Sequence, residues 1–219
     1  MPTFTAVSQA AYCPRQLYYA RRDGDDGPSP GERRRQRLAF RYGELRGADD
    51  ERLRAEPVAL APDAYRAALE RLAERDDWAA LCDPVDTHVS LAGKDCRGRV
   101  HKLVDTVGGT VPSFVSPGAP PGRGVWEPQQ VRAVAAAKAL SWEREEATSH
   151  ALVEYPAHGV VRTVRLTTRA KAAYRRALRA VRALDGPPPR LRDASRCRAC
   201  SYQDRCGVRT RSMRSLLGR

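Results

Sequence analysis

Apolar positions in the first third of the chain recur at the spacing of one helix face, with charged residues between them. This spacing predicts a first helix over residues 5–20, which contains Cys13, and a short helix over residues 63–75. Between them, residues 33–54 read as a long polar helix that is broken near Gly43 or Gly47. The stretch 21–32 is rich in Gly, Pro and Asp, so we expect a loop there.

From residue 85 onward the apolar period shortens to two, as in strands. A Gly-Gly pair separates two of the alternating runs and predicts a hairpin. The expected order is three strands, a helix, two strands and a helix, over residues 85–91, 98–104, 109–115, 128–146, 150–155, 159–166 and 168–184. Helices followed by strands in this order are typical of an α/β or α+β domain with a mixed sheet.

Three cysteines lie within ten residues near the C-terminus: Cys197, Cys200 and Cys206. A tight turn between thiols at this spacing can point their sulfurs toward one metal centre, which would need a fourth thiolate. Cys13 is the best candidate for that ligand. Such a centre would fasten the first helix to the last segment of the chain, and the spacing alone does not choose between zinc and an iron–sulfur cluster.

Two other interpretations of the C-terminal cysteines are weaker. Disulfides are typical of small secreted domains, whereas this chain has 219 residues and no visible signal peptide. Independent buried thiols would need apolar surroundings, whereas this segment is polar and rich in Arg. The remaining two cysteines, Cys82 and Cys96, lie among apolar residues, and we expect both to be small buried side chains.

Positive charge is concentrated at the end of the chain. The formal net charge is +13, and residues 160–219 hold 17 Arg or Lys against 3 Asp or Glu, whereas residues 1–159 hold 22 against 23. This asymmetry favours a polyanionic partner such as DNA. Phosphate contacts are expected from the helix over 168–184 and from the segment after it, through Arg175, Arg179, Arg182, Arg192, Arg198 and Arg205.

The hydropathy of the chain argues against a membrane role. No apolar stretch approaches the ~20 residues that span a bilayer, and no targeting segment is visible. We therefore expect a cytoplasmic protein with no membrane partner.

The element order and the cysteines together resemble a known family. The chain is similar over nearly its whole length to the CRISPR-associated RecB-like exonucleases that carry a 4Fe-4S cluster, which belong to the PD-(D/E)XK nuclease superfamily. The run Tyr12-Cys13-Pro14-Arg15 is similar to that around the family's first cluster ligand, and Cys197, Cys200 and Cys206 match the other three. The resemblance implies a PD-(D/E)XK core with a mixed sheet flanked by helices over residues 1–189. It also implies a basic iron–sulfur module over residues 190–219, closed by the N-terminal helix.

The resemblance fails at the positions where such nucleases hold Mg²⁺ or Mn²⁺. His101 stands where the family has its metal-binding Asp, Phe114 where it has a second carboxylate, and Ser116 where it has a Lys. The family's helical Gln and Tyr and its upstream His fall at Arg132, Ala136 and Gly47. Hard divalent ions need oxygen ligands, which a phenyl ring does not supply.

The resemblance therefore implies a catalytically inactive homologue that binds DNA. Its family context implies a role in CRISPR spacer acquisition, beside integrase proteins or an active paralogue. One alternative is an active Mg²⁺- or Mn²⁺-dependent single-stranded DNA exonuclease with relocated carboxylates, for which Asp105, Glu127 and Asp95 are the candidates. A second alternative is a protein–protein adaptor whose basic surface meets an acidic protein.

Overall fold

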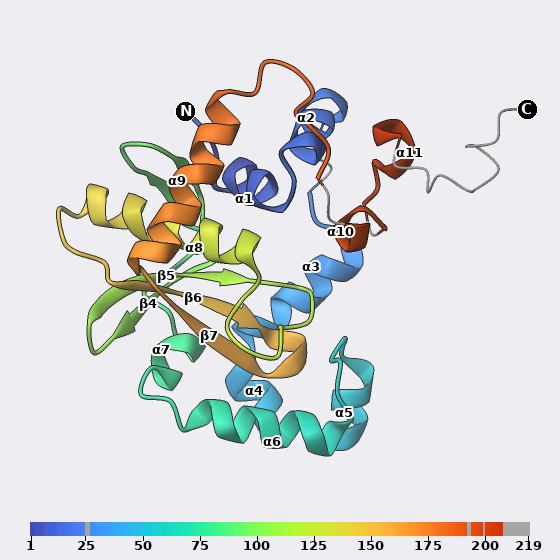
Figure 1. Ribbon diagram of the computed structural model, residues 1–219. Coiled ribbons are helices and arrows are strands. Elements are labelled where there is room, and N and C mark those ends of the chain that lie inside the picture. Colours follow the sequence, from blue (N-terminus) through green and yellow to red (C-terminus); the bar gives the residue numbers. More distant parts are fainter. Residues whose placement is uncertain (25–26, 192–193, 199, 208–219) are drawn as a thin grey trace, which may run out of the picture.

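The computed structural model describes residues 1–24, 27–191, 194–198 and 200–207. A five-stranded mixed sheet lies between two groups of helices (Figure 1). Its strand order is β1-β4-β5-β6-β7, with bounds Asp86–Thr87, Lys102–Thr106, Gly109–Val115, His150–Tyr155 and Val160–Arg165. The β5–β6 pair is parallel and the other three pairs are antiparallel. The prediction of an α/β fold with a mixed sheet flanked by helices is confirmed.

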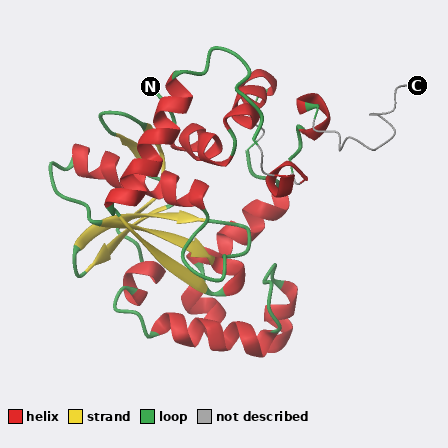
Figure 2. Ribbon diagram, viewed as in Figure 1, coloured by secondary structure: helices red, strands yellow, loops and turns green. Residues whose placement is uncertain are grey.

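Three helices cover one face of this sheet: α1 (Phe4–Tyr12), α8 (Glu127–Glu143) and α9 (Thr168–Arg182) (Figure 2). Helix α8 is buried along most of its length because its core side chains are Ala and Val, which allow close packing. A small second sheet, β2 (Ser90–Ala92) with β3 (Arg97–Arg99), closes the edge of this layer.

Short helices cover the opposite face, and together they bury a second apolar cluster. They are α3 (Pro30–Arg37), η1 (Leu38–Phe40), α4 (Tyr42–Arg46), α5 (Asp50–Ala55), α6 (Pro62–Ala73) and α7 (Trp78–Cys82), with η2 (Pro156–His158) at the end of β6. Ser29 caps α3 through a reciprocal pair of hydrogen bonds with Glu32, which fixes where this layer begins.

The predicted helix over residues 5–20 is divided in the structure, whereas the break predicted near Gly47 in the helix over residues 33–54 is confirmed at the end of α4. Residues 5–20 form two helices, α1 and α2 (Pro14–Asp23), which meet at Cys13. Cys13 has φ −162° and ψ 114°, because the ring of Pro14 disfavours the helical conformation for the residue before it. The expected helix over residues 33–54 breaks into α3, η1, α4 and α5, which turn around the rim of the sheet.

Two of the predicted strands are also divided. The run 85–91 forms β1 in the main sheet and β2 in the small sheet, with His88 between them at φ +55°. The run 98–104 forms β3 and β4, and His101 lies at the division. The strands over 109–115 and 150–155 are confirmed with their predicted bounds.

The C-terminal elements pack on the start of the chain. Helices α10 (Ala194–Arg198) and α11 (Gln203–Cys206) lie beside α2 (Figure 1). The Tyr12 hydroxyl donates to the Arg196 carbonyl at 3.0 Å, and the Arg196 guanidinium donates to the Tyr12 carbonyl at 3.0 Å. Within the described residues, none of the helices combines the length and the apolar character needed to cross a bilayer.

Candidate functional site

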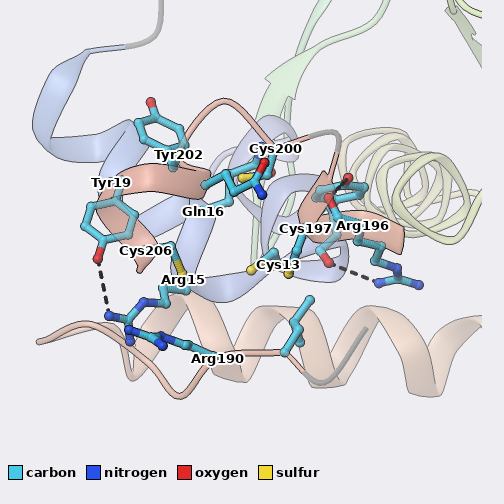
Figure 3. Close-up of a pocket in the computed structure, with 13 residues that line it drawn as sticks. Cys13, Arg15, Gln16, Tyr19, Arg190, Arg196, Cys197, Cys200, Tyr202 and Cys206 are labelled. Atoms are coloured by element: carbon cyan, nitrogen blue, oxygen red, sulfur yellow. Dashed lines mark hydrogen bonds between the residues drawn. The ribbon is translucent and has the colours of Figure 1, made fainter. Parts of the chain in front are cut away.

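The four predicted ligand cysteines line one pocket between the N-terminal helices and the C-terminal segment. Cys13 comes from the α1–α2 junction, and Cys197, Cys200 and Cys206 come from the opposite wall (Figure 3). The structure thus brings together side chains that lie more than 180 residues apart in the sequence.

Local backbone geometry places these thiols. The extended conformation of Cys13 turns the chain sharply between α1 and α2. On the opposite wall, the Cys200 N–H donates to the Cys197 carbonyl and the Cys206 N–H to the Tyr202 carbonyl, which makes two successive turns. Tyr202 stacks on Tyr19 of α2 with ring centroids 5.6 Å apart, so this wall is fixed to α2 without any ligand.

The lining of the pocket suits thiolates. Arg15, Arg190 and Arg196 line it together with the cysteines, and none of the described lining residues is acidic. Neighbouring guanidinium groups stabilise the thiolate form of cysteine, which is the form that binds metals. The sulfurs nevertheless do not form a close cage, since no three His, Cys, Asp or Glu side chains of the described chain are grouped as a metal-ion site.

All six cysteines lie in the described part of the chain, and none of them is part of a disulfide. Cys96 is fully buried, and burial raises the pKa of its thiol to about 12. Cys82 is half-buried, and burial raises its thiol pKa as well. The prediction of a buried apolar side chain is therefore confirmed for Cys96 and only partly for Cys82.

The positions aligned with nuclease metal ligands also lie together, in a cleft beside the end of β5. The rings of His101 and Phe114 are in edge contact, with centroids 6.1 Å apart. The guanidinium carbon of Arg132, from α8, lies 4.2 Å from the centroid of the Phe114 ring. Ser116 follows β5 directly, and its hydroxyl accepts from the Gln129 side chain at 2.9 Å.

His101 is an uncharged donor in this cleft. Its Nδ1 accepts from the Val115 N–H at 3.1 Å, so the proton of the neutral ring is on Nε2. Burial, followed by the charge of Arg132, lowers the pKa of His101 to about 3. The imidazole is therefore neutral at physiological pH.

Arg132 brings a positive charge to the place where the resemblance implies a metal ion. The Arg132 side chain is half-buried, and burial lowers its pKa to about 10, so the guanidinium stays charged at neutral pH. Its Nε is shut off from solvent and has no hydrogen-bond partner. A fixed guanidinium at this position repels a dication and attracts an anion.

The fallback carboxylates do not converge on this cleft. Asp105 is exposed four residues along β4 from His101, about 13 Å away, and accepts from the Thr110 hydroxyl. Asp95 pairs with Arg182 at 3.1 Å. Glu127 pairs with Arg176 at 3.5 Å and with Arg196 at 3.6 Å, on the side of the C-terminal segment.

The predicted DNA-contact arginines are only partly available to a ligand. Arg175 and Arg179 are exposed along α9 and, as described, have no ion pair. Arg182 and Arg205 are paired with Asp95 and Asp23. Arg198 is exposed in α10, and Arg192 lies outside the described residues.

Sequence reasoning missed two features of this region. Gln129, one turn before the position expected for a helical Gln, accepts from the Tyr155 hydroxyl and donates to Ser116. Lys102, next to His101, points to the opposite face of the sheet, where its ammonium donates to Glu154 at 2.9 Å in a fully buried ion pair. The pattern Gln-x25-Tyr has no period that would indicate this contact, and a lysine inside a strand usually indicates a solvent-facing position.

The low pKa of His101 predicts a loss of stability in mild acid. Below about pH 6.5 the unfolded chain binds a proton at His101 that the folded chain excludes until about pH 3. The folded state is therefore destabilised as pH falls through this window, by about 1 kcal/mol per pH unit. Urea denaturation at pH 6.5 to 4 should show that the free energy of unfolding depends less steeply on pH in His101→Asn than in the unsubstituted protein. Equal slopes would contradict the assignment of His101 as a neutral ring in the folded state.

The comparisons with known proteins add no relative. No protein-family model matches the chain, and no curated protein is significantly similar to it. What the chain does must therefore be inferred from its own residues.

Proposed function

We propose that the protein is a DNA-binding, catalytically silent homologue of the CRISPR-associated RecB-like exonucleases, held together by a 4Fe-4S cluster. It would act in CRISPR spacer acquisition, next to integrase proteins or an active paralogue. This proposal joins the resemblance in the sequence to the two sites described above.

The observation that carries the proposal is the set of side chains in the cleft. Metal-dependent phosphodiester hydrolysis needs carboxylate oxygens that hold Mg²⁺ or Mn²⁺ against the scissile phosphate. The cleft is instead lined by His101 and Arg132, with Phe114 packed against both, and the three fallback carboxylates are engaged elsewhere. The Arg132 guanidinium thus stands where an active nuclease of this family would hold Mg²⁺ or Mn²⁺. This exchange favours binding of a DNA phosphate over hydrolysis of the phosphodiester bond.

The pocket that the four cysteines line together supports the proposed cluster. Four thiols, three arginines and no described carboxylate make a soft donor set in positive surroundings, which suits an iron–sulfur cluster or zinc. Of these two, the resemblance to the exonuclease family favours the 4Fe-4S cluster. Bound there, the cluster would cross-link the two ends of the chain.

The test is to incubate the full-length protein with end-labelled single-stranded and duplex DNA, with Mg²⁺ or Mn²⁺ and then with EDTA. We expect DNA to be retained in all conditions and to stay intact. Robust metal-dependent digestion that Asp105→Ala abolishes would show an active nuclease and contradict the proposal. Absence of binding to every form of DNA at low salt would instead favour the protein–protein adaptor.

A further inference from the structure

The cleft beside Phe114 is lined by positive and neutral donors. Its volume is about 720 Å³, and five arginines line it, from α3, η1–α4, β3 and α8: Arg33, Arg37, Arg41, Arg99 and Arg132. Gln36, His88 and His101 add polar side chains. None of the lining residues in the described part of the chain is acidic, so the protein itself provides no counter-charge inside the cleft.

The arginines differ in how far the protein already satisfies them. Arg41 is fully engaged, since it pairs with Glu44 at 2.6 Å and with Glu56 at 2.7 Å. Arg33 and Arg99 each donate only to a backbone carbonyl. For Arg37 and Arg132 the described residues provide no hydrogen bond and no ion pair. Among the described residues, four of the five guanidinium groups in this cavity thus have no carboxylate partner, and two of these four have no hydrogen bond either.

Arg132 is the most informative of these groups. Burying a donor without a partner is unfavourable, and such groups are usually satisfied by the protein, by water or by an ion. Its Nε has no partner inside the protein, and its only contact of note is the face of Phe114. The neutral His101 ring places an Nε2–H donor against the same cavity. A cavity lined by several guanidinium groups and by no described carboxylate favours an anion.

The size and the rim of the cleft indicate what carries the anion. A volume of about 720 Å³ is much larger than a free phosphate needs and is in the range that accommodates a nucleotide. At the rim, the His88 ring is exposed and stacks on Phe40, with centroids 5.4 Å apart. His88 is held there at φ +55°, an unusual backbone conformation for a residue other than glycine. The ring is also in edge contact with His101, with centroids 6.3 Å apart, and an exposed ring of this kind can stack a base.

We propose that this cleft is a metal-independent phosphate site, in which Arg132 and Arg37 hold a backbone phosphate of a single DNA strand and His88 stacks the adjacent base. The proposal rests on the proposed function, because it assumes that the protein binds DNA, and it names the surface that does so. This surface is distinct from the row of arginines on α9 (Arg175, Arg179 and Arg182), here called the ridge, which the sequence indicates as the DNA contact.

The test is fluorescence anisotropy with a labelled 20-nucleotide strand in EDTA, on the full-length protein. Arg132→Met should weaken binding on the order of tenfold, as expected for losing a charge-assisted hydrogen bond. It should also raise the melting temperature, because it removes an Nε that is shut off from solvent without a hydrogen-bond partner. Arg37→Ala, at an exposed position where folding is not at risk, should weaken binding similarly and lower the salt slope by about 0.7. Arg54→Ala, at an exposed arginine outside the cleft, is the matched control.

The possible outcomes separate this inference from the proposed function. If Arg175→Ala on α9 weakens binding while Arg132→Met and Arg37→Ala do not, the protein binds DNA through the ridge and the cleft assignment is wrong. If the unsubstituted protein binds no DNA, the proposed function fails as well. Displacement of the strand by inorganic phosphate, at the same concentration of phosphate groups as a competing oligonucleotide, would indicate a small-anion site and overturn the strand assignment.

Discussion

Replacing Lys102 by methionine is expected to destabilise the protein by about 3–5 kcal/mol. The Lys102 ammonium is fully buried and donates to Glu154 at 2.9 Å, to the Ala39 carbonyl at 2.6 Å and to the Leu81 carbonyl at 2.8 Å. Methionine preserves the volume and removes the charge, so the buried Glu154 carboxylate keeps the Ser113 hydroxyl as a hydrogen-bond partner but loses its counter-charge. Breaking one side of a buried ion pair has this cost because the remaining charge is not compensated.

Guanidinium chloride denaturation measures this effect, and two further variants interpret it. The double variant Lys102→Met with Glu154→Gln should recover part of the loss, since it removes the orphaned charge as well. Arg54→Met breaks an exposed ion pair with Asp50 and should change stability by less than about 0.5 kcal/mol. A loss for Lys102→Met as small as that of Arg54→Met would show that water reaches the pair.

This buried pair also supports the cleft. Lys102 joins β4 to η1 and α7, and Glu154 and Ser113 join β6 to β5, directly under the strand that carries Phe114. The cations on the two faces of the sheet differ in their partners. Lys102 is neutralised by a carboxylate inside the protein, whereas Arg132, on the other face, has no carboxylate partner among the described residues. A preorganised anion site requires that its donor groups lie on rigid elements, and this buried ion pair makes the sheet beside the cleft rigid.

The sheet and the helices packed on it could be predicted from the sequence because their patterns are local. Alternation over residues 109–115 and 150–155 and the amphipathic pattern of α9 each depend on neighbours within a few residues. The division at Cys13 was also locally encoded, since Pro14 follows it, but the apolar period on both sides suggested one helix. The four cysteines could be grouped by their chemistry, and the structure places them in one pocket.

The cleft could not be predicted from the sequence, because the net charge of a segment does not show where its charged side chains lie in the folded protein. Residues 1–159 are close to neutral, which hides the fact that their acids and bases separate in space. Glu44 and Glu56 pair with Arg41, whereas Arg37 and Arg132 line the same cavity without an ion pair to any described residue. A separation of this kind depends on contacts between residues nearly 100 positions apart, which no local pattern encodes.

Cys13→Ala is expected to have the largest effect of all, if the proposed cluster is bound. A cluster held by Cys13 and Cys197 closes a loop of more than 180 residues, and the entropy of such a cross-link is about 5 kcal/mol in the chain-entropy treatment used for disulfides. Protein purified without oxygen should be brown and contain iron and acid-labile sulfide in equal amounts. The variant should lose most of both.

The control for this experiment is Cys82→Ala, a half-buried thiol outside the pocket, which should keep its iron and sulfide. Limited trypsin digestion gives a second readout, because the C-terminal segment is rich in arginine and the proposed cluster would hold it to Cys13. The contacts of Tyr12 with Arg196 and of Tyr19 with Tyr202 do not depend on a metal, so the variant should keep its fold; without the cluster these contacts alone hold the segment, which should therefore be cleaved faster than in the unsubstituted protein. Colourless protein that holds one zinc ion and no sulfide would show a mononuclear site instead of a cluster, and the four sulfurs would have to close around that ion. Equal iron content in Cys13→Ala and Cys82→Ala would show that Cys13 is not a ligand.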